Sequence, residues 1–265
     1  MGSGAVQSTI WGPRAADWAD VQERTVVPLY ASVIEALNVR APMAVLDVGC
    51  GSGLFCQLAA EHGASVSGID ATSMLLDIAR RRVPRADFRH CDMEQLPFPN
   101  RTFHIVTGFH AFEHADVPLN ALCEAHRVAR PGGAVVAAVW GRPDQVQAAE
   151  YLDAIAALLP VPRSGLQAGG AAASFALSEA DALPDLARDA GLEPIRSTEV
   201  DCVWRYADER TALRGLLSAG PAVRAIQASG ERAVRQAVLK AIAPYRLPTG
   251  GYELLNTCRY VIAKA

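Results

Sequence analysis

Residues 45–53 read VLDVGCGSG, and this stretch decides the fold. Three apolar residues and one acid are typical of a buried strand, and a Gly-x-Gly-x-Gly turn follows directly. The next residues, 54–60, are predicted to form a helix. Glycine permits unusual backbone dihedral angles and a close approach of ligand, and a helix N-terminus offers free N–H groups. The stretch therefore predicts a cradle for an adenosine-containing ligand.

The spacing of the glycines separates two classes of nucleotide-binding fold. The pyrophosphate-binding fingerprint is Gly-x-Gly-x-x-Gly, whereas the third glycine here comes one residue earlier. The spacing therefore disfavours a nicotinamide-dependent oxidoreductase. This class stays open as an alternative, and binding of NADH would support it.

Acidic residues follow the next two apolar runs. Asp70 ends the run 65–70, one helix and one strand after the glycine turn, where a carboxylate can accept both ribose hydroxyls. Asp92 and Met93 follow the run 86–91, where Asp92 can accept the adenine amino group while Met93 packs on the ring. Either acid could instead cap a helix or turn. The glycine turn, Asp70 and the Asp92-Met93 pair each come at the end of a predicted strand, and together they favour a ligand site.

These features resemble the class I S-adenosylmethionine-dependent methyltransferases. The resemblance covers about residues 40–140 and includes the segments 96–98 (LPF) and 127–133 (RVARPGG). It implies S-adenosyl-L-methionine as cofactor and S-adenosyl-L-homocysteine as its product. By motif position it implies these donor-binding residues: Asp47, Gly49, Cys50, Gly51, Gly53, Asp70, Ala71, Asp92, Met93, Gly108 and Phe109.

Short apolar strands alternate with helices through the centre of the chain. The expected strands are 43–48, 65–70, 86–91, 103–108 and 134–140, and the expected helices are 53–62, 72–82 and 116–130. This alternation predicts an α/β fold with a doubly wound parallel sheet that binds ligands at the carboxyl ends of its strands. The resemblance implies seven strands, mostly parallel, with one antiparallel member.

Three units are expected along the chain: an N-terminal helical segment (1–39), a methyltransferase core (40–204 and 249–265) and a helical cap (205–248). Amphipathic helices are expected over 14–38, with Trp11 and Trp18 as candidates to line the pocket. The later part should contain a loop at 165–173, a helix from Ser178 to Gly191, strands 192–204 and 252–263, and helices over 208–243. The resemblance implies that the cap selects the acceptor. Two roles stay open for Trp204, Tyr206, Arg214, Arg224 and Tyr245: they line the pocket, or they merely pack, which is the commoner fate for the aromatics.

The segment 107–114 (TGFHAFEH) is where the reaction is expected. His110 and His114 are candidate general bases, because imidazole titrates near working pH; both could instead be structural. The His-x-x-Glu-His string also matches a zinc peptidase motif, but no third ligand is recognisable. Some quinone-pathway O-methyltransferases carry Glu-x-x-Glu-His here and can hold a divalent metal; His110 replaces the first glutamate, and we predict no metal site.

Composition narrows the partners. The 265 residues carry 25 basic and 28 acidic side chains, and this net charge of −3 disfavours nucleic acid. Segment 108–111 lacks the Asn/Asp-Pro-Pro-aromatic string of enzymes that methylate DNA bases, which favours a small-molecule acceptor. The six cysteines form no Cys-x-x-Cys pair. Neither a signal peptide nor a membrane span is recognised, so a bacterial cytoplasmic protein, monomeric or homodimeric, is expected.

The leading hypothesis is methyl transfer to oxygen, nitrogen or carbon of a small metabolite. A protein with the same donor site could instead keep the cofactor unconsumed, for instance in a cyclisation. Accumulation of demethylated cofactor would separate these two hypotheses.

Overall fold

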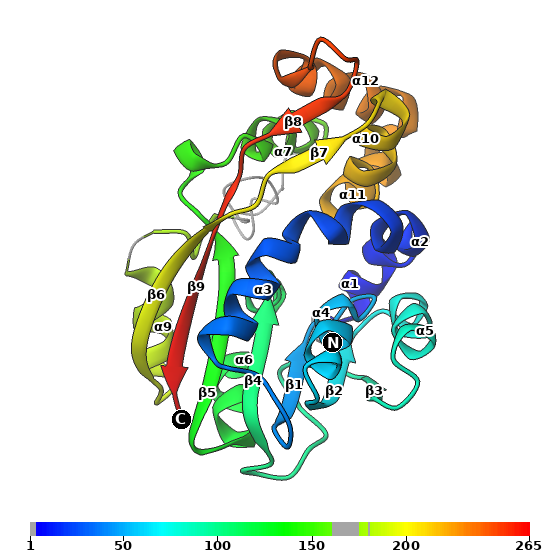
Figure 1. Cartoon of the computed structure of the whole chain (residues 1–265). Coiled ribbons are helices and arrows are strands. Elements are labelled where there is room, and N and C mark those ends of the chain that lie inside the picture. Colours follow the sequence, from blue (N-terminus) through cyan, green and yellow to red (C-terminus); the bar gives the residue numbers. More distant parts are fainter. Residues whose placement is uncertain (1–3, 161–174, 180) are drawn as a thin grey trace.

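The computed structural model describes residues 4–160, 175–179 and 181–265, and its centre is a seven-stranded sheet in the order β3-β2-β1-β4-β5-β9-β6 (Figure 1). Strands β1 to β5 are parallel, and β9 runs antiparallel to β5 and β6. This confirms the predicted doubly wound, mostly parallel sheet. The strands are β1 Ala44–Val48, β2 Ser65–Asp70, β3 Asp87–His90, β4 Phe103–Phe109, β5 Ala129–Trp140, β6 Glu193–Asp201 and β9 Thr257–Lys264.

Helices cover both faces of this sheet because successive strand residues point to opposite sides. Val45 of β1 packs in the first core cluster, with α3 (Val27–Ala36), α4 (Leu54–Glu61) and α5 (Ser73–Arg82). Its neighbour Leu46 packs in the second, with α6 (Pro118–Val128) and α9 (Ala182–Asp189). Both clusters extend across the sheet, so its strands are buried on two sides.

A group of elements lies beyond the carboxyl ends of the strands, and we call this group the cap (Figure 1). It contains α10 (Glu209–Leu216), α11 (Gly220–Ser229), α12 (Glu231–Ile242), the 3-10 turn η5 (Ala243–Tyr245), and the two-stranded pair β7 (Trp204–Tyr206) and β8 (Tyr252–Leu254). A helix missing from the expectations, α7 (Ala148–Ala156), packs against α11 and α12 and contributes to the same third core cluster. Short 3-10 turns η3 (Phe112–His114) and η4 (Pro143–Gln145) follow β4 and β5.

The two strands expected near the C-terminus are each divided. The run expected over 192–204 becomes β6 and β7, and the run expected over 252–263 becomes β8 and β9. Both divide at the same level, where Cys202 N donates to Asn256 O at 2.6 Å. The Asn256 side chain accepts a hydrogen bond from Ala148 N at 2.8 Å and so ties this point to α7. The chain thus leaves the main sheet and enters the cap here.

The first described helix of the N-terminal segment starts at Gly4, earlier than the helices expected over 14–38. It forms α1 (Gly4–Trp11), α2 (Ala15–Asp17), a π-helical turn η1 (Trp18–Gln22) and a 3-10 turn η2 (Glu23–Val26) before α3. Helix α1 contacts α11, and η1 contacts α10, so the segment lies between sheet and cap (Figure 1). Helix α9 starts at Ala182, later than expected, and the expected loop 165–173 lies outside the described residues. Among the described helices, none combines the length and apolar character that crossing a bilayer requires.

Candidate active site

A cavity opens where the parallel strands β1, β2 and β4 end, as the fold class predicts. Nine residues predicted from the sequence line it: Gly49, Gly51, Asp70, Ala71, Asp92, Met93, Phe109, His110 and His114. Four others do not line it: Asp47, Cys50, Gly53 and Gly108. These four support the cavity from behind.

Glycine is required at two of the supporting positions for packing. Gly53 begins helix α4 in the left-handed conformation, with φ +80°, and a Cβ there would lie 2.9 Å from the Cβ of Ala79. A Cβ on Gly108 would lie 2.4 Å from the ring of Phe112. Distances this short are overlaps, so any side chain would push α5 or η3 away. The glycine pattern therefore holds the walls close together as well as admitting a ligand.

The carboxylate of Asp70 is already engaged with the backbone. Its Oδ2 accepts a hydrogen bond from Gly51 N at 2.9 Å, and its Oδ1 accepts one from Thr72 N at 2.8 Å. Burial raises the pKa of Asp70, and these backbone hydrogen bonds lower it. The capping role that the sequence left open is thus present, and the same side chain also lines the cavity. Each oxygen keeps a second lone pair for a ligand.

Asp92 and Met93 form another part of the same wall. Asp92 Oδ1 accepts a hydrogen bond from Glu94 N at 3.0 Å. Helix α1 begins against this acid, because a Cβ on Gly4 would lie 3.4 Å from Asp92 Oδ2. The N-terminal segment therefore covers this end of the cavity.

Asp47 lies beneath the glycine turn, with only 3% of its surface exposed. Thr107 Oγ1 lies 2.8 Å from its Oδ1. Burial raises the pKa of Asp47 to about 8, and the hydrogen bond to Thr107 opposes this shift. Cys50 is buried nearby, and its Sγ packs on the backbone of Gly68. Both residues lie beneath the turn and do not line the cavity.

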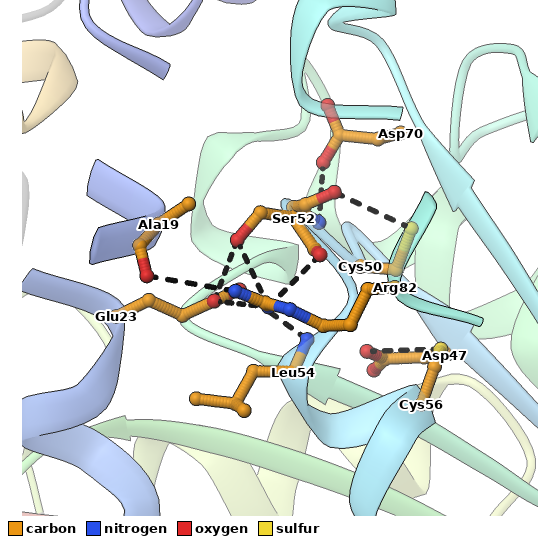
Figure 2. Close-up of polar contacts among 10 residues, drawn as sticks. Ala19, Glu23, Asp47, Cys50, Ser52, Leu54, Cys56, Asp70 and Arg82 are labelled. Atoms are coloured by element: carbon orange, nitrogen blue, oxygen red, sulfur yellow. Dashed lines mark hydrogen bonds and ion pairs between the residues drawn. The ribbon is translucent and has the colours of Figure 1, made fainter. Parts of the chain in front are cut away.

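A buried ion pair that the sequence did not indicate also supports the turn. Arg82 donates to Glu23 Oε2 at 2.6 Å and to Ser52 O at 2.9 Å. Figure 2 shows its guanidinium between Glu23 and Ser52, whose hydroxyl donates to Glu23 at 2.5 Å. The carboxylate also accepts from Leu54 N at 3.5 Å. This cluster fastens η2 to the first turn of α4, where the helix dipole favours a negative charge.

The two candidate histidines have different surroundings. His110 has a left-handed φ of +49°, and its ring lies 4.6 Å from that of Trp140. Its Nε2 lies 3.5 Å from Cys258 Sγ, and its Nδ1 lies 3.5 Å from Glu113 Oε1. Nε2 of His110 thus contacts Cys258, whereas its buried Nδ1 lies near Glu113 without a hydrogen-bond partner among the described residues.

His114 is the freer of the two histidines. No hydrogen bond to its ring nitrogens occurs within residues 4–160, 175–179 and 181–265, and its ring lies 6.1 Å from that of Trp11. Burial lowers the pKa of His114, which favours the neutral ring. A neutral imidazole can accept a proton, so His114 suits the role of a base better than His110 does.

Beyond His110 the cavity continues into an aromatic chamber, which we define by Trp140, Tyr151, Leu152 and Trp204. The Trp140 and Trp204 rings are 5.7 Å apart, and the Tyr151 and Trp204 rings are 6.5 Å apart. Trp11 and Trp18 also line the cavity, as expected.

The cap contributes less to the cavity wall than expected. Of its candidate residues only Trp204 lines the cavity; Ala219 and Pro221, which were not anticipated, line it too. Tyr206 instead donates to Gln22 at 2.8 Å, and Arg214 pairs with Asp17.

Metal ligands are not grouped in the part of the chain that the structure describes. No set of three or more His, Cys, Asp or Glu side chains lies there in an arrangement suited to a metal ion.

Comparison with known proteins agrees with this geometry. Residues 46–137 match a family described as "Methyltransferase domain". The chain is 32% identical to a ubiquinone biosynthesis O-methyltransferase of Ruegeria pomeroyi over 159 residues, which is 58% of this chain and 62% of the relative. It is 33% identical to a demethylmenaquinone methyltransferase of Renibacterium salmoninarum over 111 residues, 42% of this chain and 47% of the relative. It thus spans less than two thirds of either relative.

Solved structures show the same fold. A putative methyltransferase from Bacillus halodurans superposes with a TM-score of 0.59 at 16% identity, covering 89% of this chain and 97% of that chain. The [4+2]-cyclase SpnF gives a TM-score of 0.53 at 21% identity, covering 87% and 80%. The strand order, the cavity and the domain match together define a class I S-adenosylmethionine-dependent methyltransferase domain.

Proposed function

We propose that the protein transfers a methyl group from S-adenosyl-L-methionine to oxygen, nitrogen or carbon of a small metabolite. The observation that carries this proposal is the continuity of one cavity. It joins the glycine turn, Asp70 and Asp92 to an aromatic chamber, and His110 and His114 line the same space. A donor and an acceptor bound at its two ends would meet beside the histidines.

The chemistry of the lining fits the donor. Asp70 would accept from the ribose hydroxyls, Asp92 from the adenine amino group, and Met93 would pack on the ring. Gly49, Gly51 and Phe109 would contact the methionine part. S-adenosyl-L-methionine supplies a methyl group on a sulfonium, which leaves as a neutral thioether. The carboxylates of the lining complement this positive charge.

The protein's own contribution would be alignment, exclusion of water and proton removal. The aromatic walls hold an acceptor in place, and alignment of reactants alone supplies much of a rate enhancement. His114 would accept the proton that a hydroxyl or amine acceptor loses. His110, held between Cys258 and Glu113, would fix the wall beside it.

The test is whether donor is consumed. The protein is incubated with S-adenosyl-L-methionine and a bacterial metabolite extract, and S-adenosyl-L-homocysteine is measured against a sample without extract. Quinone precursors are tested first, because the two relatives are named for quinone methylation. Accumulation of S-adenosyl-L-homocysteine that depends on the extract supports the proposal. Bound donor that is never consumed would favour the cofactor-retaining alternative; a [4+2]-cyclase has the same fold.

A further inference from the structure

We infer that the acceptor is a flat, apolar molecule without negative charge that docks a hydroxyl or amine group on the carboxylate of Glu113. This inference rests on the proposed function and specifies its substrate class. It draws on three observations: the charges that line the cavity, the hydrogen bonds of Glu113, and the aromatic chamber beside it.

The charges of the lining are of one sign. Three carboxylates line the cavity, those of Asp70, Asp92 and Glu113, and no Lys or Arg of the described chain does so. Two arginines of the surrounding elements are paired away from the cavity. Arg82 pairs with Glu23 beneath the glycine turn, and Arg214 pairs with Asp17. An anionic acceptor would lose its hydration and meet like charge without a compensating cation. The lining therefore selects against anions.

Glu113 differs from the other two acids in its hydrogen bonds. Asp70 and Asp92 each accept from backbone N–H groups. Glu113 Oε1 lies 3.5 Å from His110 Nδ1, whereas its Oε2 is buried without a hydrogen-bond partner in the described part of the chain. Only 5% of this side chain is exposed. An unpartnered buried carboxylate oxygen is costly, and an O–H or N–H donor of a ligand would satisfy it.

The aromatic chamber begins next to this carboxylate. His110, which contacts Glu113, lies against Trp140, and the Trp140 ring is followed by those of Trp204 and Tyr151. Walls of tilted rings suit a planar apolar body. The indole nitrogen of Trp204 is also buried without a hydrogen-bond partner among the described residues. It can donate to an oxygen at the far end of the ligand.

Three indole compounds that differ in the charge of their side chain test this inference. Tryptophol carries a neutral hydroxyl, tryptamine a cationic amine and indole-3-acetate an anion. Their binding to the complex with S-adenosyl-L-homocysteine is measured by ligand-observed NMR titration. Tryptophol and tryptamine are expected to bind about ten- to hundredfold more tightly than indole-3-acetate, the size of a hydrogen bond to a charged group. A preference for tryptophol over tryptamine would assign a hydroxyl acceptor, and the reverse an amine.

Variants show which group causes the discrimination. Glu113→Gln keeps the side-chain shape and should reduce the preference against indole-3-acetate to about threefold or less, whereas the exposed control Glu61→Gln should leave it unchanged. Trp204→Leu should weaken all three compounds alike. Equal binding of all three compounds, or binding of none, would overturn the inference while S-adenosyl-L-homocysteine still binds. So would a preference that survives Glu113→Gln. Failure to bind S-adenosyl-L-homocysteine would instead contradict the proposed function.

Discussion

At the scale of single residues, Asp70 combines two roles. Its carboxylate holds the backbone of Gly51 and Thr72 and also lines the cavity where a ribose would lie. One side chain thus fixes the shape of the glycine turn and offers free lone pairs to a ligand.

Asp70→Ala should weaken binding of S-adenosyl-L-homocysteine at least tenfold, because hydrogen bonds to a charged group contribute about 1.5–3 kcal/mol. Calorimetry measures the affinity, and circular dichroism checks that the variant is folded. Asp189→Ala, on an exposed position at the end of α9, is the matched control. Equal affinity of wild type and Asp70→Ala would refute the ribose assignment.

Asp47 should make the stability of the protein depend on pH. Its pKa rises from the ordinary 3.8 to about 8 in the folded state, so the folded chain holds a proton that the unfolded chain has lost between these values. Stability therefore falls as pH rises from about 4 to 8, by up to about 1.4 kcal/mol per pH unit. Asp47→Asn removes this contribution and should be the more stable protein at pH 8. Urea unfolding at pH 5, 6.5 and 8 gives the free energy of unfolding of the wild type and of Asp47→Asn. If the two free energies changed with pH in the same way, the account would be contradicted.

The sequence predicted the residues that belong to short motifs and missed those that act across long separations. Asp70, Asp92 and Met93 follow strands at regular spacing, so their position at the cavity could be predicted. Glu23 and Arg82 are 59 residues apart and belong to no motif, and their contact exists only once η2 packs on α4. Nine of the thirteen predicted residues reach the cavity, whereas Asp47, Cys50, Gly53 and Gly108 pack behind it. A motif position alone does not separate the two groups.

At the scale of elements, the junction of β1 and α4 is held by conformation and packing together. Gly53→Ala should destabilise the protein by more than the about 1–2 kcal/mol of a left-handed alanine, because its Cβ would overlap Ala79. Gly132→Ala is the matched control, since its φ is +74° and no atom lies within 4 Å of the added Cβ. Urea unfolding measures both. A loss no larger at Gly53 than at Gly132 would show that the packing against α5 does not matter.

The ion pair beneath the turn should stabilise the attachment of the N-terminal segment. Glu23→Gln leaves Arg82 buried without its counter-charge and should cost about 3–5 kcal/mol. Asp77→Asn breaks the exposed pair with Arg80 on the same helix and should cost about 1 kcal/mol or less. The comparison uses the free energy of unfolding. Similar small losses in both variants would mean that the pair is not buried in solution.

Element boundaries followed from the sequence where periodicity was clear. The first five strands and the helices between them lie close to their predicted ranges, although β5 begins five residues early at Ala129. Helix α7 and the divisions of the last strands were missed. No proline or glycine marks a break at 202 or 256, and the contacts that divide the two runs join positions far apart in the chain. Local sequence patterns do not predict contacts between such distant positions.

At the scale of the whole molecule, the cavity receives side chains from the N-terminal segment, the sheet and the cap. Trp18, His110 and Pro221 come from these three parts and line the same space. The division into segment, core and cap remains a proposal, and α7 packs with the cap although its sequence lies within the predicted core.

Calorimetric titration of the folded protein with S-adenosyl-L-methionine and S-adenosyl-L-homocysteine tests the central claim most directly, with NADH as the comparison ligand. The account predicts that both adenosyl compounds bind at one site per chain and that NADH does not compete with them. A folded protein that binds neither compound, or that binds NADH in their place, would contradict it.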